Sequence, residues 1–209
     1  MTIASELEAR AEELEARALS LETEKRALEE EFREMSRRFV DLERQNTHLA
    51  SLFVASYQLL SSADRDDVLT AIQEIVTNLV GSEEVAIYEC DRSAGELVLA
   101  ASCGLDADRL RRVPIGSGVI GRVAATGSSY LVTEAGTPSE ECPDLTACIA
   151  LRVADQVAGV VAIFRLLPQK NGFTRVDEEL FDLLSTQAAG ALSTSHLRAR
   201  LGVAAGPSA

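Results

Sequence analysis

The chain has 209 residues, which is enough for one domain of ordinary size and an additional segment but too short for two full catalytic domains. Its 33 acidic and 20 basic residues give a formal net charge of −13, so its overall field disfavours DNA, RNA and anionic membranes as partners. No apolar run reaches the roughly 20 residues that span a bilayer, and the N-terminal residues lack the pattern of a secretion signal. We therefore expect a cytoplasmic protein with no nucleic-acid or membrane partner.

The cysteines and histidines do not have the spacing of a metal site. Four cysteines stand at irregular intervals in or near apolar stretches, and neither His48 nor His196 lies close to them in the sequence. The pattern favours buried free thiols, so we expect no bound metal ion.

An apolar residue recurs at every seventh position in the first fifty residues. Because no glycine precedes Gly81 and no proline precedes Pro114, this interval predicts one continuous coiled-coil helix over residues 1–52. We assign the repeated residues to the d positions of the heptad: Leu7, Leu14, Leu21, Leu28, Met35, Leu42 and Leu49. The a positions are then Ala11, Ala18, Lys25, Phe32, Phe39, Asn46 and Phe53, so the first half of this heptad seam is the weaker half.

Asn46 determines the expected orientation of the coiled coil. An asparagine at an a position is costly to bury unless it meets its own copy across a symmetry axis, which favours a parallel homodimer in register. The flanking charges agree with this register for Arg10, Arg17 and Arg38, each of which would face a glutamate five residues later on the partner helix. Glu24 would face Glu29, which is repulsive. The alternative is a single amphipathic helix folded back on its own domain.

Residues 53–201 are expected to form one α+β domain with an antiparallel sheet, followed by a flexible tail over residues 202–209. Capping residues at 61–67 separate the first helix of this domain from a second one, which ends at Gly81. Two pairs of apolar segments then predict two hairpins, the second of them central in the sheet with helices covering one face. These segments are residues 83–91 with 95–103, and residues 146–155 with 156–167.

A final helix is expected to begin after Thr174. Thr174 can cap this helix, and the acidic residues 177–179 complement the positive end of its dipole. An apolar face at helical spacing then continues to about Arg200.

Gly116, Gly118 and Gly121 match the G-x-G-x-x-G pattern of dinucleotide-binding loops. Such a loop follows a buried apolar strand, whereas the residues before Gly116 are charged and include Pro114. We therefore prefer a turn that leads into a short helix, in which Gly121 allows close packing and Gly127 ends the helix.

Three motifs, taken in order, resemble the GAF domain family of ligand-binding and signalling modules. They are PIGSGVIGRVAATGSSYLV, ALRVADQVAGVVAIF and GFTRVDEELFDLLSTQAAGAL, and the resemblance covers residues from about 50 to 200. It implies a GAF-like, PAS-like antiparallel sheet with flanking helices, a ligand pocket beside the glycine-rich helix, and dimerisation through the first and last helices. The residues that we assign to this pocket are Ser102, Ile120, Arg122, Thr133 and Cys148, with a surface position as the alternative for Arg122.

The resemblance also separates several functional classes. Relatives that bind cyclic nucleotides carry an Asn-Lys pair, which stands here in reversed order as Lys170 and Asn171, although Phe173, Asp177 and Glu178 fit the rest of their motif. Bilin-binding relatives need a Cys-His pair, and haem-binding relatives need an axial histidine in the pocket. Relatives that reduce free methionine sulfoxide carry a cysteine where this chain has Ile120. We therefore expect no cofactor and no catalytic residue.

The sequence thus predicts a non-enzymatic signalling or scaffold protein, a GAF homodimer that acts through contacts with another signalling protein. The alternative is a sensor that binds a small molecule in the GAF pocket, with a cyclic nucleotide among the candidates, and relays to a separate partner. A thiol-dependent free methionine sulfoxide reductase is the remote alternative.

Overall fold

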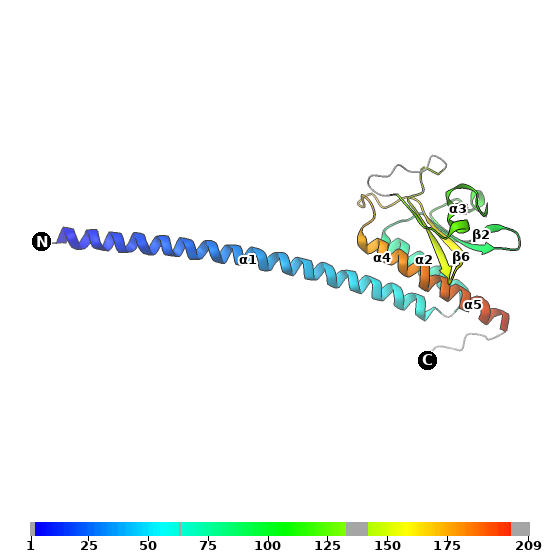
Figure 1. Cartoon of the computed structure of the whole chain (residues 1–209), viewed down its shortest axis with the longest axis horizontal. Coiled ribbons are helices and arrows are strands. Elements are labelled where there is room, and N and C mark those ends of the chain that lie inside the picture. The colour runs from blue at the N-terminus through cyan, green and yellow to red at the C-terminus, as the bar shows by residue number, and fades with distance from the viewer. Residues whose placement is uncertain (1–2, 63, 133–141, 202–209) are drawn as a thin grey trace. The chain divides into compact units, whose positions relative to one another are not determined.

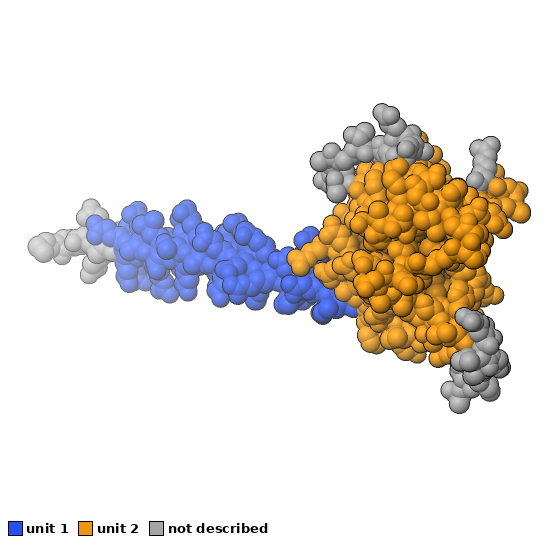
Figure 2. Space-filling view, turned by 45° about the vertical axis from the view of Figure 1, so that its right-hand side comes forward, with its two compact units in different colours: residues 1–49 blue, residues 50–209 orange. Residues whose placement is uncertain are grey.

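The structure is a computed structural model that describes residues 3–62, 64–132 and 142–201. Helix α1 (Ile3–Ser61) is the first element of the chain (Figure 1). The chain divides into two compact units, residues 1–49 and residues 50–209 (Figure 2). We describe each unit by itself.

The first unit is the continuous helix that the heptad pattern predicted. Ion pairs one turn apart support it on its surface, including those of Lys25 with Glu29 and of Arg38 with Glu34. The apolar seam residues are each between 57% and 67% exposed in the single chain: Leu14, Leu21, Leu28, Phe32, Met35, Phe39, Leu42 and Leu49. Asn46 on the same seam is exposed as well, and the side chain of Leu7 lies outside the described residues.

The second unit begins with the last turns of α1. Ala55 and Leu59 are buried in its core, whereas Phe53 and Tyr57 on another side of the helix are 71% and 64% exposed. Helix α2 (Arg65–Glu74) follows, with the Asp64 side chain as its N-cap, and continues as a π-helical segment over Ile75–Val80. The interruption after Ser61 and the end of this second helix at Gly81 were both predicted.

Six antiparallel strands form one sheet in the order β3-β2-β1-β6-β5-β4. The first hairpin is β1 (Val85–Asp91) with β2 (Glu96–Cys103), and the second is β5 (Ala147–Val153) with β6 (Gln156–Ile163). The edge strands are the short β3 (Arg112–Pro114) and β4 (Tyr130–Leu131). Strand β6 is central as expected, while β5 stands next to the edge strand β4.

Helices cover both faces of the sheet, where the sequence predicted cover on one face. The end of α1, α2, α4 (Arg175–Leu183) and α5 (Ala189–Leu201), with a π-helical segment over Leu184–Ala188 between the last two, pack on one face. Helix α3 (Gly118–Thr126) packs on the other face (Figure 1). Because both faces of β5 and β6 are covered, their sequences are apolar almost throughout.

The glycine-rich stretch is the predicted turn and short helix. A Cβ atom at Gly121 would collide with the carbonyl oxygen of Pro114, so only glycine lets α3 approach the preceding loop this closely. Gly127 ends α3 in the left-handed conformation, with φ of 70°, and its N–H donates to the carbonyl of Val123. These glycines therefore serve the packing of the helix.

Candidate functional site

Small side chains form a row across the sheet on the face that α3 covers. Directly opposed residues of antiparallel strands share a face, and the strand register aligns Tyr130, Cys148, Ala162, Ala86 and Ser102 across β4, β5, β6, β1 and β2. We call the four adjacent residues from Cys148 to Ser102 the small-residue row. The register thus brings the predicted pocket residues Cys148 and Ser102 into one row, separated by two alanines.

Tyr88 lies next to this row, two residues after Ala86 on the same face of β1. The residue is 0% exposed, and its hydroxyl group has no hydrogen-bond partner among the described residues. Burial, with a smaller effect of the neighbouring Cys148 and Cys142 thiols, raises the pKa of Tyr88 to about 12. The hydroxyl is therefore a neutral hydrogen-bond donor at physiological pH, and sequence reasoning did not single it out.

Helix α3 supplies the apolar cover of this face. Ile120 is 8% exposed and packs in the same cluster as Tyr88 and Cys148, together with Val119 from the same helix. Arg122 is exposed, which is the alternative that the sequence left open for it. Thr133, the fifth predicted pocket residue, lies outside the described residues.

Burial holds three of the four thiols in their protonated form. Burial raises the pKa of Cys148 far above its usual value, and burial also raises the pKa of Cys90 and of Cys142. A thiol that remains protonated is a poor nucleophile. Within residues 3–62, 64–132 and 142–201, no three histidine, cysteine, aspartate or glutamate side chains gather where they could hold a metal ion.

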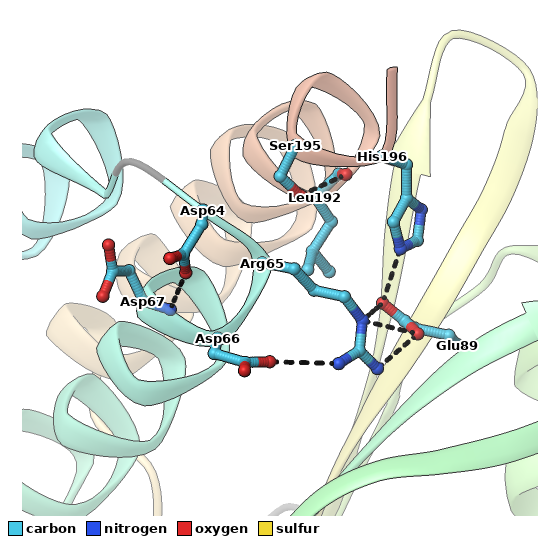
Figure 3. A network of polar contacts seen from close by, with 8 residues as sticks. All are labelled: Asp64, Arg65, Asp66, Asp67, Glu89, Leu192, Ser195 and His196. Atoms are coloured by element: carbon cyan, nitrogen blue, oxygen red, sulfur yellow. Dashed lines mark hydrogen bonds and ion pairs between the residues drawn. The ribbon is translucent and has the colours of Figure 1, made fainter. Parts of the chain in front are cut away.

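The opposite face carries a polar network around Glu89 of β1 (Figure 3). Arg65 of α2 donates to both carboxylate oxygens of Glu89, with Nη2 to Oε2 at 2.7 Å, and Nε2 of His196 in α5 lies 3.2 Å from Oε1. The Glu89 side chain is 19% exposed. The network joins α2 and α5 to the sheet, and it connects residues too distant in the sequence for any local pattern to indicate.

The residues that partly fit the cyclic-nucleotide motif lie near the start of α4. The Lys170 ammonium lies 2.6 Å from Oδ1 of Asp177 and also contacts the carbonyl oxygen of Val80, while the Asp177 carboxylate accepts hydrogen bonds from the N–H and the hydroxyl group of Thr174. Phe173 packs with the cluster on the α2 and α5 side of the sheet. These residues thus fix the start of α4 away from the row beside Tyr88, which confirms the expected capping.

Solved structures with this fold include GAF domains cut from larger proteins and a free methionine sulfoxide reductase. The GAF domain of a phosphoenolpyruvate-protein phosphotransferase from Acinetobacter is 20% identical, with a TM-score of 0.63 over 74% of this chain and 98% of that chain. The corresponding domain from Coxiella burnetii is 18% identical, with a TM-score of 0.60 over 75% and 97%. Free methionine-R-sulfoxide reductase from Neisseria meningitidis, solved with its substrate, is 21% identical, with a TM-score of 0.54 over 75% and 92%.

These likenesses show the fold alone, because each identity is below 25%. No curated protein gives a significant match to this chain. No helix among the described residues has the length and apolar character to cross a membrane.

The GAF domain family model matches residues 64–194, a range that includes both hairpins, α3 and α4. Together with the six-stranded sheet and its flanking helices, this match shows that the chain belongs to the GAF domain family.

Proposed function

We propose that the protein is a non-enzymatic GAF homodimer, paired in parallel along the heptad seam of α1, that acts through contacts with another signalling protein. One observation carries the proposal: eight large apolar side chains of the seam, from Leu14 to Leu49, are each more than half exposed in the single chain. Burying one such side chain contributes about 1.5–3 kcal/mol. A second copy of the seam would cover all of them.

The expected stability of the helix in the first unit also favours a partner helix. Most of the stability of a helix in a protein comes from packing of its apolar face, and each exposed ion pair such as Lys25 with Glu29 adds only about 0.2–0.5 kcal/mol. A helix of this length with an apolar seam therefore gains most of its stability from a partner helix. The weak heptads around Ala11, Ala18 and Lys25 are the part that a helix from another protein would most easily replace.

The raised thiol pKa values support a non-enzymatic role. Reduction of a sulfoxide by thiols needs a thiolate nucleophile, whereas burial keeps Cys90, Cys142 and Cys148 protonated. Ile120 stands where reductase relatives carry a cysteine, and it is buried against the sheet. These facts weigh against the reductase alternative.

Sedimentation equilibrium of the full chain tests the dimer. Wild-type protein is expected at twice the chain mass of 22.4 kDa, and a Phe32→Ser, Phe39→Ser variant is expected to dissociate at least tenfold more readily, because it loses two seam contacts in each chain. Val40→Ser is the matched control, since Val40 is 44% exposed but lies beside the seam. A monomeric wild-type chain, or equal weakening by Val40→Ser, would contradict the proposal.

A sensor is the second candidate function, and Tyr88 is the observation that favours it. A buried hydroxyl without a protein partner is uncommon in native proteins, and a bound small molecule with a hydrogen-bond acceptor could pair with it. Native mass spectrometry of gently purified protein tests this function. A small extra mass that is lost on denaturation would support the sensor, and a bare dimer would support the scaffold alone.

A further inference from the structure

We propose that residues 11–31 of α1 bind a helix of a partner protein, one with large apolar residues at its core positions and basic residues at its flanking positions. Residues 11–31 are three complete heptads, and we call them the opening heptads. The proposal rests on the proposed function and deepens it, because it names the chemistry of the partner helix.

The core positions of the opening heptads are poorly matched to a second copy of themselves. Their d residues are each between 57% and 67% exposed in the single chain: Leu14, Leu21 and Leu28. Their a residues are Ala11, Ala18 and Lys25. In a parallel homodimer each a residue would face its own copy, so two layers would hold only methyl side chains and the third would bring two ammonium groups together. A helix with larger apolar core residues would cover the exposed leucines more completely.

The flanking positions of the opening heptads are mostly acidic. Arg17 stands at one of the six e and g positions, and the other five are glutamates: Glu15, Glu22, Glu24, Glu29 and Glu31. In a parallel homodimer Arg10 and Arg17 would compensate two of these glutamates, but Glu24 would face Glu29, and like charges at these positions oppose pairing. Basic residues on the flanks of a partner helix would instead attract all five glutamates.

Glu29 also has cationic neighbours within its own helix. Nζ of Lys25 lies 3.8 Å and Nη2 of Arg33 lies 4.0 Å from its carboxylate. Both ion pairs are exposed, with the Lys25 and Arg33 side chains 75% and 66% exposed, and such pairs contribute little. They therefore leave the acidic character of the flank in place.

The second half of the seam has the composition of a helix that pairs with itself. Phe32 and Phe39 at its a positions are 65% and 61% exposed in the single chain and are large enough to fill their layers. Asn46 at the next a position favours its own copy, and Arg38 would attract Glu43 on the flank. A homodimer held together by residues 32–49 would thus present two sets of opening heptads to partner helices.

Two synthetic peptides of four heptads test the proposal on the full chain. Both have leucine at the a and d positions, and one has lysine and the other glutamate at every e and g position, so the flanks of each peptide oppose pairing with itself. In fluorescence anisotropy titrations at about 0.15 M ionic strength, the lysine-flanked peptide is expected to bind wild-type protein at least tenfold more tightly than the glutamate-flanked peptide. Sedimentation of the bound sample is expected to show two chains with two peptides.

Paired charge variants separate recognition by the seam from general attraction to an acidic protein. Glu24→Lys with Glu29→Lys reverses two flanking charges but keeps a like-charged pair in the homodimer, and it is expected to weaken the lysine-flanked peptide at least tenfold. Glu13→Lys with Glu30→Lys is the matched control, because it makes the same change in net charge at the c and f positions. Its expected effect is less than about threefold.

A second pair of variants tests the apolar contact. Leu21→Ser removes a d residue and is expected to weaken the lysine-flanked peptide at least tenfold. Leu19→Ser is the control, since Leu19 is 66% exposed but stands at a b position away from the seam. It is expected to leave the affinity unchanged.

Several results would overturn the proposal. Equal affinity for the two peptides, or no binding of either, would mean that a second copy occupies the whole seam. Equal weakening by a variant and its control would mean that binding does not use the seam. Sedimentation of the wild-type chain without peptide reports the homodimer separately. A dimer that does not bind the lysine-flanked peptide would therefore contradict this inference alone, whereas a monomeric chain would contradict the proposed function.

Discussion

The ammonium group of Lys170 lies 2.6 Å from the Asp177 carboxylate, and the side chain of Asp177 is only 3% exposed. Two elements meet at this ion pair, because Lys170 also contacts the carbonyl oxygen of Val80 at the end of the π-helical segment. The other oxygen of Asp177 accepts two hydrogen bonds from Thr174. One carboxylate therefore both caps α4 and compensates a largely buried cation.

Replacement of Asp177 by alanine is expected to destabilise the protein by about 3 kcal/mol, because it leaves Lys170 without its carboxylate partner and removes the Asp177 half of the capping box at the start of α4. Urea unfolding at fixed protein concentration measures this change. Glu178→Ala is the control, since Glu178 is an exposed acidic residue in the same first turn, and its expected cost is less than about 1 kcal/mol. Equal effects of the two substitutions would show that the buried pair contributes nothing.

Substitution of Asn46 by leucine is expected to raise the thermal midpoint and to allow oligomers other than the parallel dimer. A leucine at an a position buries apolar surface, but it removes the polar contact that distinguishes a parallel dimer from other assemblies. Sedimentation velocity should then show species larger than a dimer. Arg44→Leu places the same side chain off the seam and is expected to leave the dimer unchanged. A pure dimer in both variants would mean that the GAF helices determine the assembly.

Tyr88 is expected to make the protein sensitive to alkali. Its pKa is raised from 10.0 to about 12 on folding, so the folded state holds this proton more tightly than the unfolded state does. The resulting stability is complete below pH 10 and is lost as the pH rises from about 10 to 12, by roughly 2 kcal/mol. Thermal midpoints of the wild type and of Tyr88→Phe should therefore converge or cross in this range, because cysteines that titrate nearby are common to both. If the difference between the two thermal midpoints stayed constant from about pH 10 to 12, this prediction would be wrong.

The cysteines should react with iodoacetamide in the order of their exposure. Cys103 is exposed, whereas Cys148 is buried and has a strongly raised pKa, so the Cys148 thiol is expected to remain unmodified in the native protein. Peptide mass spectrometry after brief alkylation measures both sites at once, and alkylation in urea provides the control. Modification of Cys148 at a rate similar to that of Cys103 would reopen the reductase alternative.

Local patterns predicted most of the fold. Capping residues and glycines marked helix termini at Ser61, Gly81, Gly127 and Thr174. Alternation marked the first hairpin, and a nearly continuous apolar pair of segments marked the second. Each of these features depends on residues a few positions apart, so its physical cause lies within a short segment. The sequence predicted helices on only one face of the sheet. The second covered face was missed, because the position of α3 depends on how it packs against strands distant in the sequence.

The candidate site was predictable only in part. The motif resemblance placed Ser102, Ile120 and Cys148 near one another, and the register of the sheet brings the first and last of these into one row. Tyr88 was missed because a tyrosine in an apolar strand resembles any other core residue until the partners of its hydroxyl group are known. The contact between Glu89 and His196 was missed for a similar reason, since it joins strands and helices that only the tertiary fold brings together.

Disulfide cross-linking at position 46 tests the central claim, a parallel dimer in register, most directly. Asn46→Cys in a Cys103→Ser background places one thiol at an a position of each helix, and a positions of a parallel dimer face their own copies. Mild oxidation is expected to convert this variant to a covalent dimer of twice 22.4 kDa on non-reducing gels, whereas Arg44→Cys in the same background remains monomeric on the gel. Absence of the Asn46→Cys cross-link, or equal cross-linking of both variants, would contradict the account.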